Sequence, residues 1–483
     1  MNFSAQDINQ IQSHGLTLDA VNKQIEQFKN GFPFVDIVRP ASNGDGVRQI
    51  SKIDCQKYTD IYNEYRKSHK IVKFVPASGA ATRMFKDLFD FLLSKTPNNV
   101  SRLTTANIQR FAFWDNLKLF LPNGATDTNI VDCLLNGSGL NYGNMPKALI
   151  AFHKYPDGSK TPIEEHLCEG FQYANSGDGV HIHFTISPEH RHDFESLLEQ
   201  IIPQYESKYG VKYDVTLSEQ KSSTDTIAMN SDNTVFRNDD GTLLFRPSGH
   251  GALLANLEDI DADLIFIKNI DNVLIESLRG DTIKYKQVLA GLLVDLQAQI
   301  FDFIKAIDTN SANAPQIHKF VVNNFGIKLA RPLTLAEYRN ILNRPIRVCG
   351  VVKNNGEPGG GPFWIRDKNG NVSLQIVESS QIAPESKDIM KTANYFNPVD
   401  LVCGIKDVNG NKFDLDKYVD EDMGIISEKS KNGLTLRAME RPGLWNGAMA
   451  KWNTVLVDVP ASTFSPVKVI TDLLNNAHQT KSY

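Results

Sequence analysis

The sequence predicts an α/β protein with a mixed β-sheet flanked by helices. Short apolar runs that resemble buried strands alternate with longer helical patterns between about residues 146 and 270, and strand-like runs resume after about residue 330. Such alternation is typical of α/β layering around a largely parallel sheet. The composition agrees with this class, because 41% of the 483 residues are hydrophobic and 22% are charged. The length allows two or three domains.

The predicted elements follow one another in three parts. Residues 1–70 predict an N-terminal helical segment. A core over 71–330 begins with the strand Ile71–Pro76 and carries a helical insertion, rich in Phe and Leu, at about 85–143. Its further predicted strands are 148–152, 180–187, 211–217 and 263–270, and its helices are 162–173, 189–208, 251–258 and 281–306. Residues 331–483 should complete the sheet and a ligand site, with strands at 346–353, 373–377, 401–405 and 454–459 and a helix at 467–474.

Charge and cysteine content exclude several classes of protein. The net charge is −5, so nucleic acid is not expected as the main partner. The start MNFSAQDINQIQ lacks the basic and apolar regions of a signal peptide, and no apolar run approaches the roughly 18 residues of a membrane span. The five cysteines are scattered and form no CxxC pair, which argues against a disulfide framework or a structural zinc site. We therefore expect a soluble, cytoplasmic protein with no membrane partner.

The turn after the first strand is a candidate phosphate site. Ligands of open α/β sheets bind outside the carboxyl ends of the strands. Small residues there let backbone N–H groups approach a phosphate chain, and the helix that follows adds its positive end. Arg83 could then hold phosphate oxygens with two hydrogen bonds. On these residues alone, a tight turn with a surface arginine is an equal alternative. The turn consists of Ser78, Gly79, Ala80, Ala81, Thr82 and Arg83.

This turn resembles the G-x-G-T-R signature of sugar-nucleotide pyrophosphorylases, and four further segments match that family in the order in which it has them. The matches cover residues 74–474, and the chain as a whole also resembles an uncharacterised bacterial family. The four segments are Met145–Ile150 with the helix after it, Leu244–Gly251 (P-x-G-H-G in the family), Lys268–Asn272 (N-x-D-N), and Val459–Lys468 leading to Asp472 (V-P-x-x-x-F-x-P-V-K…D-L-L).

The resemblance implies a fold, a reaction and partners. The fold would be the Rossmann-like nucleotide-diphospho-sugar transferase fold of the GT-A type. The reaction would form a nucleotide sugar, with a UDP-sugar favoured, and pyrophosphate from a nucleoside triphosphate and a sugar 1-phosphate. The sugar phosphate would attack the α-phosphorus in line, so catalysis would rest on positioning and on stabilisation of charge.

The resemblance also assigns roles to single residues. Arg83 would hold the β- and γ-phosphates, Lys147 the α-phosphate region, and Lys468 the sugar phosphate or the α-phosphate opposite. Asp271 would bind Mg²⁺, which prefers oxygen ligands. Asn269 and Asn272 would lie against the sugar. The nucleotide-binding residues would be Ser78, Gly79, Ala80, Ala81, Thr82, Gln220, Gly249 and His250.

The predictions for Gln220 and Gly360 each have a basis of their own. Gln220 follows a predicted strand where related uridylyltransferases place a base-reading glutamine, which favours UTP. The glycine-rich loop around Gly360 could close over a sugar, or it could simply turn.

The sequence departs from the family pattern at three places. Ala81 replaces the second glycine of the signature. Lys147 follows Arg83 by 64 residues (147 − 83), far more than the usual short gap. Ala252 stands where the UDP-glucose enzymes have Asp, so the sugar need not be glucose.

Two other functions stay open. A glycosyltransferase on the same fold would need no triphosphate clamp, so Arg83 and Lys147 weigh against it. A nucleotide-sugar-binding regulator or inactive paralogue is favoured by Ala81, whereas the three retained cations weigh against it.

Overall fold

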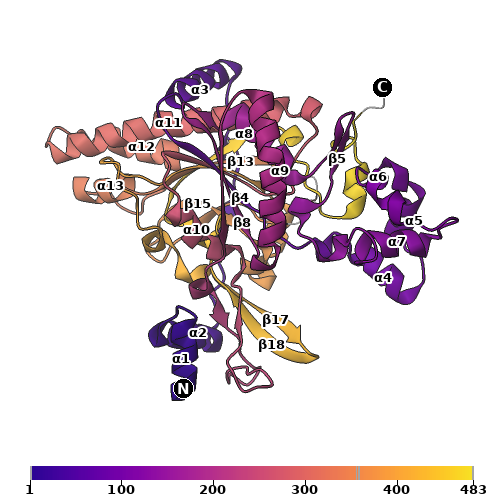
Figure 1. The fold of residues 1–483 in the computed structure, drawn as a ribbon. Helices are drawn as coiled ribbons and strands as arrows, with labels where there is room; N and C mark the ends of the chain where they lie inside the picture. The colour runs from indigo at the N-terminus through magenta and orange to yellow at the C-terminus, as the bar shows by residue number, and fades with distance from the viewer. Residues whose placement is uncertain (1–2, 355, 357–358, 481–483) are drawn as a thin grey trace. The chain divides into compact units, whose positions relative to one another are not determined.

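A computed structural model describes residues 3–354, 356 and 359–480 and divides the chain into two compact units (Figure 1). Each unit is assembled from segments that are distant in the sequence. Unit 1 comprises residues 1–61, 220–264 and 289–459, and unit 2 comprises residues 62–219, 265–288 and 460–483.

Unit 1 is built around a mixed five-stranded array in the order β2-β3-β19-β13-β16. β13 pairs in parallel with β19 and antiparallel with β16. A three-stranded sheet β1-β14-β15 and the two-stranded pairs β10–β11 and β17–β18 complete its strands. The strands are β1 Ile37–Pro40, β2 Ser42–Asn43, β3 Gly46–Arg48, β10 Thr226–Ile227, β11 Phe245–Arg246, β13 Ile346–Lys353, β14 Gly361–Arg366, β15 Val372–Val377, β16 Tyr395–Gly404, β17 Ile425–Lys431, β18 Leu434–Glu440 and β19 Asn453–Asp458.

All three sequence segments of unit 1 contribute helices. The helices that lie wholly or mainly in this unit are α1 Ala5–Ser13, α2 Leu18–Asn30, α3 Lys52–Tyr65, α10 Leu254–Asp259, α11 Gly280–Asp308, α12 Ala314–Phe325, α13 Leu335–Leu342 and α14 Asp388–Lys391.

Unit 2 carries the strands that position most of the candidate site. β4 (Ile71–Pro76) and β9 (Tyr213–Glu219) both pair in parallel with β8 (Gly179–Ile186), and β12 (Leu264–Lys268) neighbours β4. α8 (Pro162–Tyr173) and α9 (Arg191–Tyr209) run beside these strands (Figure 1). Parallel pairing brings the carboxyl ends of β4, β8 and β9 to the same edge, where a ligand would bind. The remaining strands are β5 His153–Tyr155, β6 Gly158–Lys160 and β7 Asn175–Ser176.

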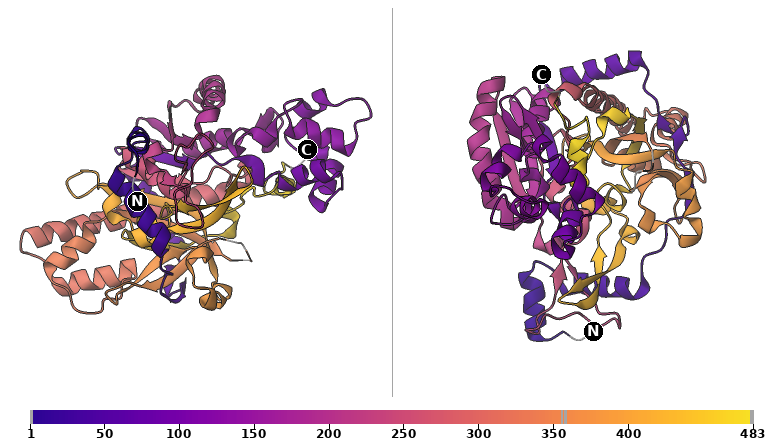
Figure 2. Two further views of the ribbon diagram at one scale, coloured as in Figure 1. Left: turned by 90° about the horizontal axis from the view of Figure 1, so that it is seen from below. Right: turned by 90° about the vertical axis from the view of Figure 1, so that its right-hand side faces the viewer.

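The helical insertion of unit 2 packs around a hydrophobic cluster and stands away from β4, β8 and β9 (Figure 2, purple). Its helices are α4 Lys86–Ser94, α5 Asn99–Ala106, α6 Trp114–Leu117 and α7 Asp127–Leu135. These helices lie within 85–143, the range for which the sequence predicts a helical insertion.

Several predicted elements lie where the sequence placed them, and others differ. β4, α8 and β13 have the predicted bounds. Residues 1–70 are not wholly helical, because three short strands lie between 37 and 48. The predicted strand at 148–152 is wrong: a 3-10 turn covers Lys147–Leu149, and the apolar side chains of this run enter hydrophobic clusters instead of a sheet. Short apolar runs do not by themselves distinguish these outcomes.

The predicted helix at 467–474 is a 3-10 turn over Ile470–Leu474 that an extended segment precedes. The backbone N–H groups of Lys468 and Val469 donate to the carboxylate of Asp472, at 2.7 and 2.8 Å, and not to helical carbonyls. This side-chain cap fixes where the turn begins.

One helix is more apolar than the sequence analysis expected of any segment in this chain. α11 is long and apolar enough to cross a membrane by length and composition, although 56% of its most apolar window is buried inside the protein. A single such helix is weak evidence, because the core helices of globular proteins pass the same test.

Candidate active site

The loop after β4 lies at the carboxyl edge of the unit 2 strands. The N–H of Ala77 donates to the carbonyl of Thr185 (2.8 Å), and the Ser187 hydroxyl donates to the carbonyl of Ser78 (3.3 Å), so the end of β8 holds the start of the loop. Gly79, Ala80, Thr82 and Arg83 are exposed. Within the described part of the chain, Arg83 makes no hydrogen bond or ion pair. Its guanidinium is therefore available to a ligand. We call residues 78–83 the phosphate loop.

Ala81, the departure from the signature, has a packing reason. Its side chain is fully buried in the hydrophobic cluster of the insertion, together with Met84 and Phe85. A glycine would leave out a methyl group that this cluster contacts. The exposed face of the phosphate loop consists of its other residues.

The 64-residue separation of Arg83 and Lys147 is closed in space. Ala80 forms an isolated antiparallel bridge with Pro146. The N–H of Ala81 donates to the carbonyl of Met145 (3.2 Å), and the N–H of Lys147 donates to the carbonyl of Gly79 (3.2 Å). The insertion therefore leaves and returns at neighbouring points, and Lys147 begins beside the phosphate loop.

Lys147 is tied to two distant segments of the same unit. Its Nζ donates to Asp271 Oδ2 at 2.6 Å and to the carbonyl of Val467 at 2.7 Å. The N–H of Val467 in turn donates to the carbonyl of Asp271 (3.1 Å). The ammonium and carboxylate side chains are 14% and 19% exposed, so solvent or a ligand reaches both.

The segment 464–468, which we call the strap, brings Lys468 to this group. The N–H of Ser465 donates to Asn272 Oδ1 (2.9 Å), and Asn272 also forms a bridge with Pro466. Lys468 Nζ lies 5.9 Å from the ring centroid of Phe464. The phosphate loop, Lys147, the turn 269–272 and the strap thus converge, although they come from four parts of the sequence.

The helical insertion packs against the turn after β12 and against the strap. Its hydrophobic cluster includes Val273 from the turn after β12 and Val467, Ile470 and Leu473 from the strap and the turn that follows it. The N–H of Ile470 also donates to the carbonyl of Met84 (3.2 Å). Within unit 2 the insertion is thus part of the support of the site.

Charged side chains are buried behind the site. Glu169 of α8 accepts hydrogen bonds from Lys73 of β4 (2.9 Å) and Lys268 of β12 (2.7 Å), and all three side chains are at most 1% exposed. Burial lowers the pKa of Lys73 to about 7 against the opposing effect of Glu169. Burial raises the pKa of Glu169, but the ammonium groups of Lys268 and Lys73 outweigh it and hold that pKa well below its usual range. His166 Nε2 lies 3.1 Å from the carbonyl of Ile270, directly before Asp271.

Three of the remaining predicted residues cluster in unit 1. The ring of His250 stacks on Trp445 with centroids 4.0 Å apart, accepts a hydrogen bond at Nδ1 from the N–H of Leu444 (2.9 Å), and places Nε2 3.4 Å from Glu378 Oε1. The hydrogen bond from His250 lowers the pKa of Glu378. A Cβ on Gly360 would lie 3.4 Å from Glu378 Cγ. Gly249 has φ +71°, which favours glycine.

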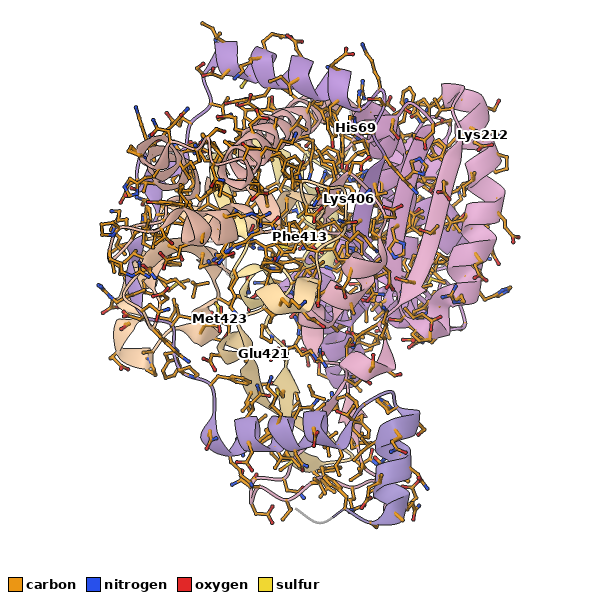
Figure 3. All side chains as sticks on the ribbon, turned by 90° about the vertical axis from the view of Figure 1, so that its left-hand side faces the viewer. His69, Lys212, Lys406, Phe413, Glu421 and Met423 are labelled. Atoms are coloured by element: carbon orange, nitrogen blue, oxygen red, sulfur yellow. The ribbon has the colours of Figure 1, made fainter. Side chains whose placement is uncertain are left out.

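The other predicted base-binding residue lies on a loop of unit 1. The amide nitrogen of Gln220 donates to Asp225 Oδ1 at 3.0 Å. Sequence reasoning missed Glu378, although a carboxylate directly after the predicted strand 373–377 is a signal that could have revealed it. Figure 3 shows the side chains of the described residues as sticks.

The donor atoms around Asp271 limit the kind of metal site that the chain can form. In the described ranges no group of three or more His, Cys, Asp or Glu side chains could hold a metal ion. Mg²⁺, however, is commonly bound by one or two carboxylates together with substrate phosphates. Asp271 therefore fits a Mg²⁺ ion that arrives with a triphosphate and not a resident ion in a cage of protein ligands.

Comparison with known structures gives the fold. The chain is similar to the uridine diphosphate N-acetylglucosamine pyrophosphorylase of Trypanosoma brucei, solved with an inhibitor, with a TM-score of 0.52 and 12% identity over 98% of this chain and 79% of that one. It is also similar to a mutant UDP-glucose pyrophosphorylase of Leishmania major in complex with UDP-glucose (TM-score 0.48, 13% identity, 100% and 80% covered). The structure is thus a mixed α/β fold like that of the nucleotidyltransferase-type pyrophosphorylases.

The sequence comparisons point to one family. No curated protein matches the sequence. A family described as "Domain of unknown function (DUF4301)" matches residues 4–479, nearly the whole chain, and the chain therefore belongs to this family.

Proposed function

We propose that this protein is a sugar-1-phosphate nucleotidyltransferase that makes a nucleotide sugar, with a UDP-sugar favoured, and pyrophosphate. The observation that carries the proposal is the convergence of Lys147, Asp271 and the strap beside the exposed phosphate loop. The reaction moves a nucleotidyl group between phosphate oxygens, so it needs cations and backbone donors around one phosphorus and no covalent intermediate. The similarity of the fold to UDP-sugar pyrophosphorylases supports the same reaction class.

The contacts of Lys147 suggest how the site accepts a triphosphate. Asp271 holds the Lys147 ammonium at 2.6 Å. An α-phosphate oxygen would replace this carboxylate as the partner of Lys147, and Asp271 would then be free to hold Mg²⁺. A Mg²⁺ ion held there would supply positive charge to offset the negative charge of the phosphates. Arg83, on the exposed phosphate loop, would hold the β- and γ-phosphates, and Lys468 the incoming sugar phosphate.

The remaining proposed contacts are those to the sugar and to the nucleoside. Asn269 and Asn272, on the turn after β12, and Gly360, on its loop in unit 1, would contact the sugar. Gly249 and His250 would lie against the nucleoside. The reactants would be small phosphorylated metabolites, and we propose the cytoplasm as the site of the reaction.

The proposal is tested by a direct assay. The protein is incubated with Mg²⁺, each nucleoside triphosphate in turn and a panel of sugar 1-phosphates, and pyrophosphate release is measured. Release should depend on both substrates together. If a nucleotide sugar binds but no combination releases pyrophosphate, the protein is a binding protein and not an enzyme. Transfer of sugar from a nucleotide sugar to an acceptor would instead identify a glycosyltransferase.

Removal of divalent metal should abolish turnover. Because Asp271 is a single carboxylate and the triphosphate carries several negative charges, the productive substrate would be the Mg²⁺ complex. Pyrophosphate release in excess EDTA should fall to the background rate and return when Mg²⁺ or Mn²⁺ exceeds the chelator. The melting temperature should not change with EDTA, since the proposed Mg²⁺ would arrive with the substrate. Undiminished activity in the chelator would contradict this role of Asp271.

UTP should bind more tightly than ATP, CTP or GTP. The basis is Gln220, because an amide can pair with both the donor and the acceptor on the edge of uracil. Calorimetric titration of each nucleotide with Mg²⁺ measures the preference, and Gln220→Ala should reduce it. Gln204→Ala, which changes a glutamine on α9, is the matched control. A parent protein that binds ATP or GTP more tightly than UTP would contradict the prediction.

A further inference from the structure

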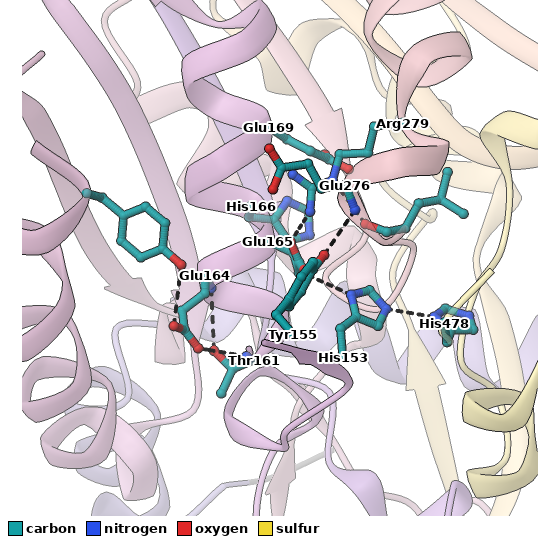
Figure 4. A network of polar contacts seen from close by, with 12 residues as sticks. His153, Tyr155, Thr161, Glu164, Glu165, His166, Glu169, Glu276, Arg279 and His478 are labelled. Atoms are coloured by element: carbon teal, nitrogen blue, oxygen red, sulfur yellow. Dashed lines mark hydrogen bonds and ion pairs between the residues drawn. The ribbon is translucent and has the colours of Figure 1, made fainter. Parts of the chain in front are cut away.

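A buried chain of hydrogen bonds links helix α8 to the strap, and Figure 4 shows its part from Glu165 through His153 to His478. Glu165 Oε1 lies 2.6 Å from His153 Nδ1, His153 Nε2 lies 2.8 Å from His478 Nδ1, and His478 Nε2 lies 3.2 Å from the Ser465 hydroxyl. Glu165 and His153 are fully buried, and His478 is 1% exposed. The four side chains come from α8, β5, the C-terminal segment and the strap.

The partners of these atoms assign the protons along the chain. Glu165 also accepts hydrogen bonds from Arg279 and from the Tyr155 hydroxyl (2.9 Å), so its carboxylate is an acceptor throughout. Burial raises the pKa of Glu165, but His153 and Arg279 outweigh it and lower that pKa. An ionised Glu165 requires His153 Nδ1 to donate.

The rest of the chain is fixed by distance. Burial lowers the pKa of His478 to about 3, so this ring is neutral, and one of its nitrogens donates while the other accepts. Its two nitrogens lie within hydrogen-bond distance of His153 and Ser465, so the chain runs from Ser465 to Glu165. Arg279 pairs with the Glu165 carboxylate at its end.

Ser465 stands at the point where this chain meets the candidate site. Its N–H is held by Asn272 and its hydroxyl by His478, so the residue is fixed on two sides. Two residues further on, the carbonyl of Val467 accepts the Lys147 ammonium. Lys468 follows directly. A displacement of Ser465 would therefore be passed on to both lysines.

We propose that His478 and Ser465 are positioning residues that hold the strap so that Lys147 and Lys468 meet the reacting phosphate. This inference rests on the proposed function. The attacking group in that reaction is a phosphate oxygen that is already ionised, so it needs no general base. The chain acts through geometry, because directional hydrogen bonds to a buried ion pair hold the strap in one position. Small misplacements of catalytic groups are costly, since a shift of about 1 Å can reduce a rate about 100-fold.

The first test compares three variants of the strap. Ser465→Ala removes the hydroxyl and should lower kcat about 10-fold or more, with KM for the triphosphate changed less than twofold. Ser465→Thr keeps the hydroxyl and should recover most of kcat. Ser462→Ala is the matched control, because its exposed hydroxyl lies three residues earlier and bonds Asp281 instead. A parental kcat for Ser465→Ala, or equal losses in the Ala and Thr variants, would overturn the proposal.

A second test separates this inference from the proposed function, because it needs no turnover. Nitrogen NMR of the histidine rings reports which nitrogen carries the proton. His478 should be neutral near pH 7, with one protonated ring nitrogen. Addition of UTP with Mg²⁺ should shift the His478 signals in the parent, and the shift should be much smaller in Ser465→Ala.

The outcomes are distinct. A parent that shows a neutral His478 and the UTP-induced shift, but no turnover with any sugar phosphate, would reject the proposed reaction and leave the link between strap and nucleotide site in place. A UTP-induced shift of the same size in Ser465→Ala would overturn the positioning role whatever the activity. His478→Phe, which preserves a ring but breaks both hydrogen bonds, should reproduce the kcat loss of Ser465→Ala. The double variant should lose no more than either single one.

Discussion

Lys147→Ala and Lys468→Ala should each lose about 10²- to 10³-fold in kcat and still bind the nucleoside triphosphate. In the proposed reaction both ammonium groups face one phosphorus, where negative charge is largest in the transition state. Losing either should therefore reduce kcat more than it weakens binding in the ground state. Steady-state rates of pyrophosphate release and calorimetric dissociation constants measure the two effects separately. Melting temperatures measured alongside separate a loss of catalysis from a loss of folding, because the side chains of the Lys147–Asp271 pair are only 14% and 19% exposed.

Two further variants make this prediction specific. Arg83→Ala should mainly weaken binding of the triphosphate, since its proposed partners are the β- and γ-phosphates. Lys154→Ala, which removes an exposed lysine paired with Asp115, should leave both constants unchanged. Parental rates in both Lys147→Ala and Lys468→Ala would refute the proposed chemistry.

The sequence was sufficient for elements whose limits are set locally. β4 is an apolar run that ends at Pro76, and α8 begins after Thr161, which caps it with Pro162 at the first turn. Residues of this kind act within a few positions, so they can be recognised without knowledge of the fold. The order of the matched motifs likewise predicted one site from Arg83, Lys147, Asp271 and Lys468. The structure brings Lys147 and Asp271 together and places the carbonyl of Val467, the residue before Lys468, against Lys147.

The features that sequence reasoning missed depend on contacts between distant residues. His153 and His478 are separated by 325 positions (478 − 153), and neither belongs to a recognisable motif. The methyl group of Ala81 makes apolar contacts only because the insertion folds against it. Residues 148–152 have the composition of a strand, but the helical insertion offers their side chains an apolar surface, and tertiary packing outweighs local preference.

Glu169→Gln should destabilise the protein by about 3–5 kcal/mol, the usual cost of removing one partner from a buried ion pair. Glu169 is fully buried and accepts hydrogen bonds from Lys73, Lys268 and the Tyr173 hydroxyl. A glutamine fits the same volume, but its carbonyl carries no charge and its amide group points hydrogen-bond donors at ammonium groups. The melting temperature measured by calorimetry should fall by roughly 10 °C. Glu206→Gln, which changes a carboxylate paired with the exposed Lys212, is the control and should change it little.

The loss should also depend on pH, and the sign follows from Lys73. Burial lowers the pKa of its ammonium group from 10.5 to about 7, so between these values the unfolded chain binds a proton that the folded protein does not. The contribution of Lys73 to stability therefore rises as the pH increases from 7 towards 10.5. Without the Glu169 carboxylate this pKa should fall further, because the group that favours the charged form is gone. A neutral lysine needs no carboxylate, so the difference in melting temperature between Glu169→Gln and the parent should be larger at pH 6 than at pH 9. A difference that is the same at both pH values would show that Lys73 keeps its charge, and that the cost of the substitution comes from the other partners of Glu169.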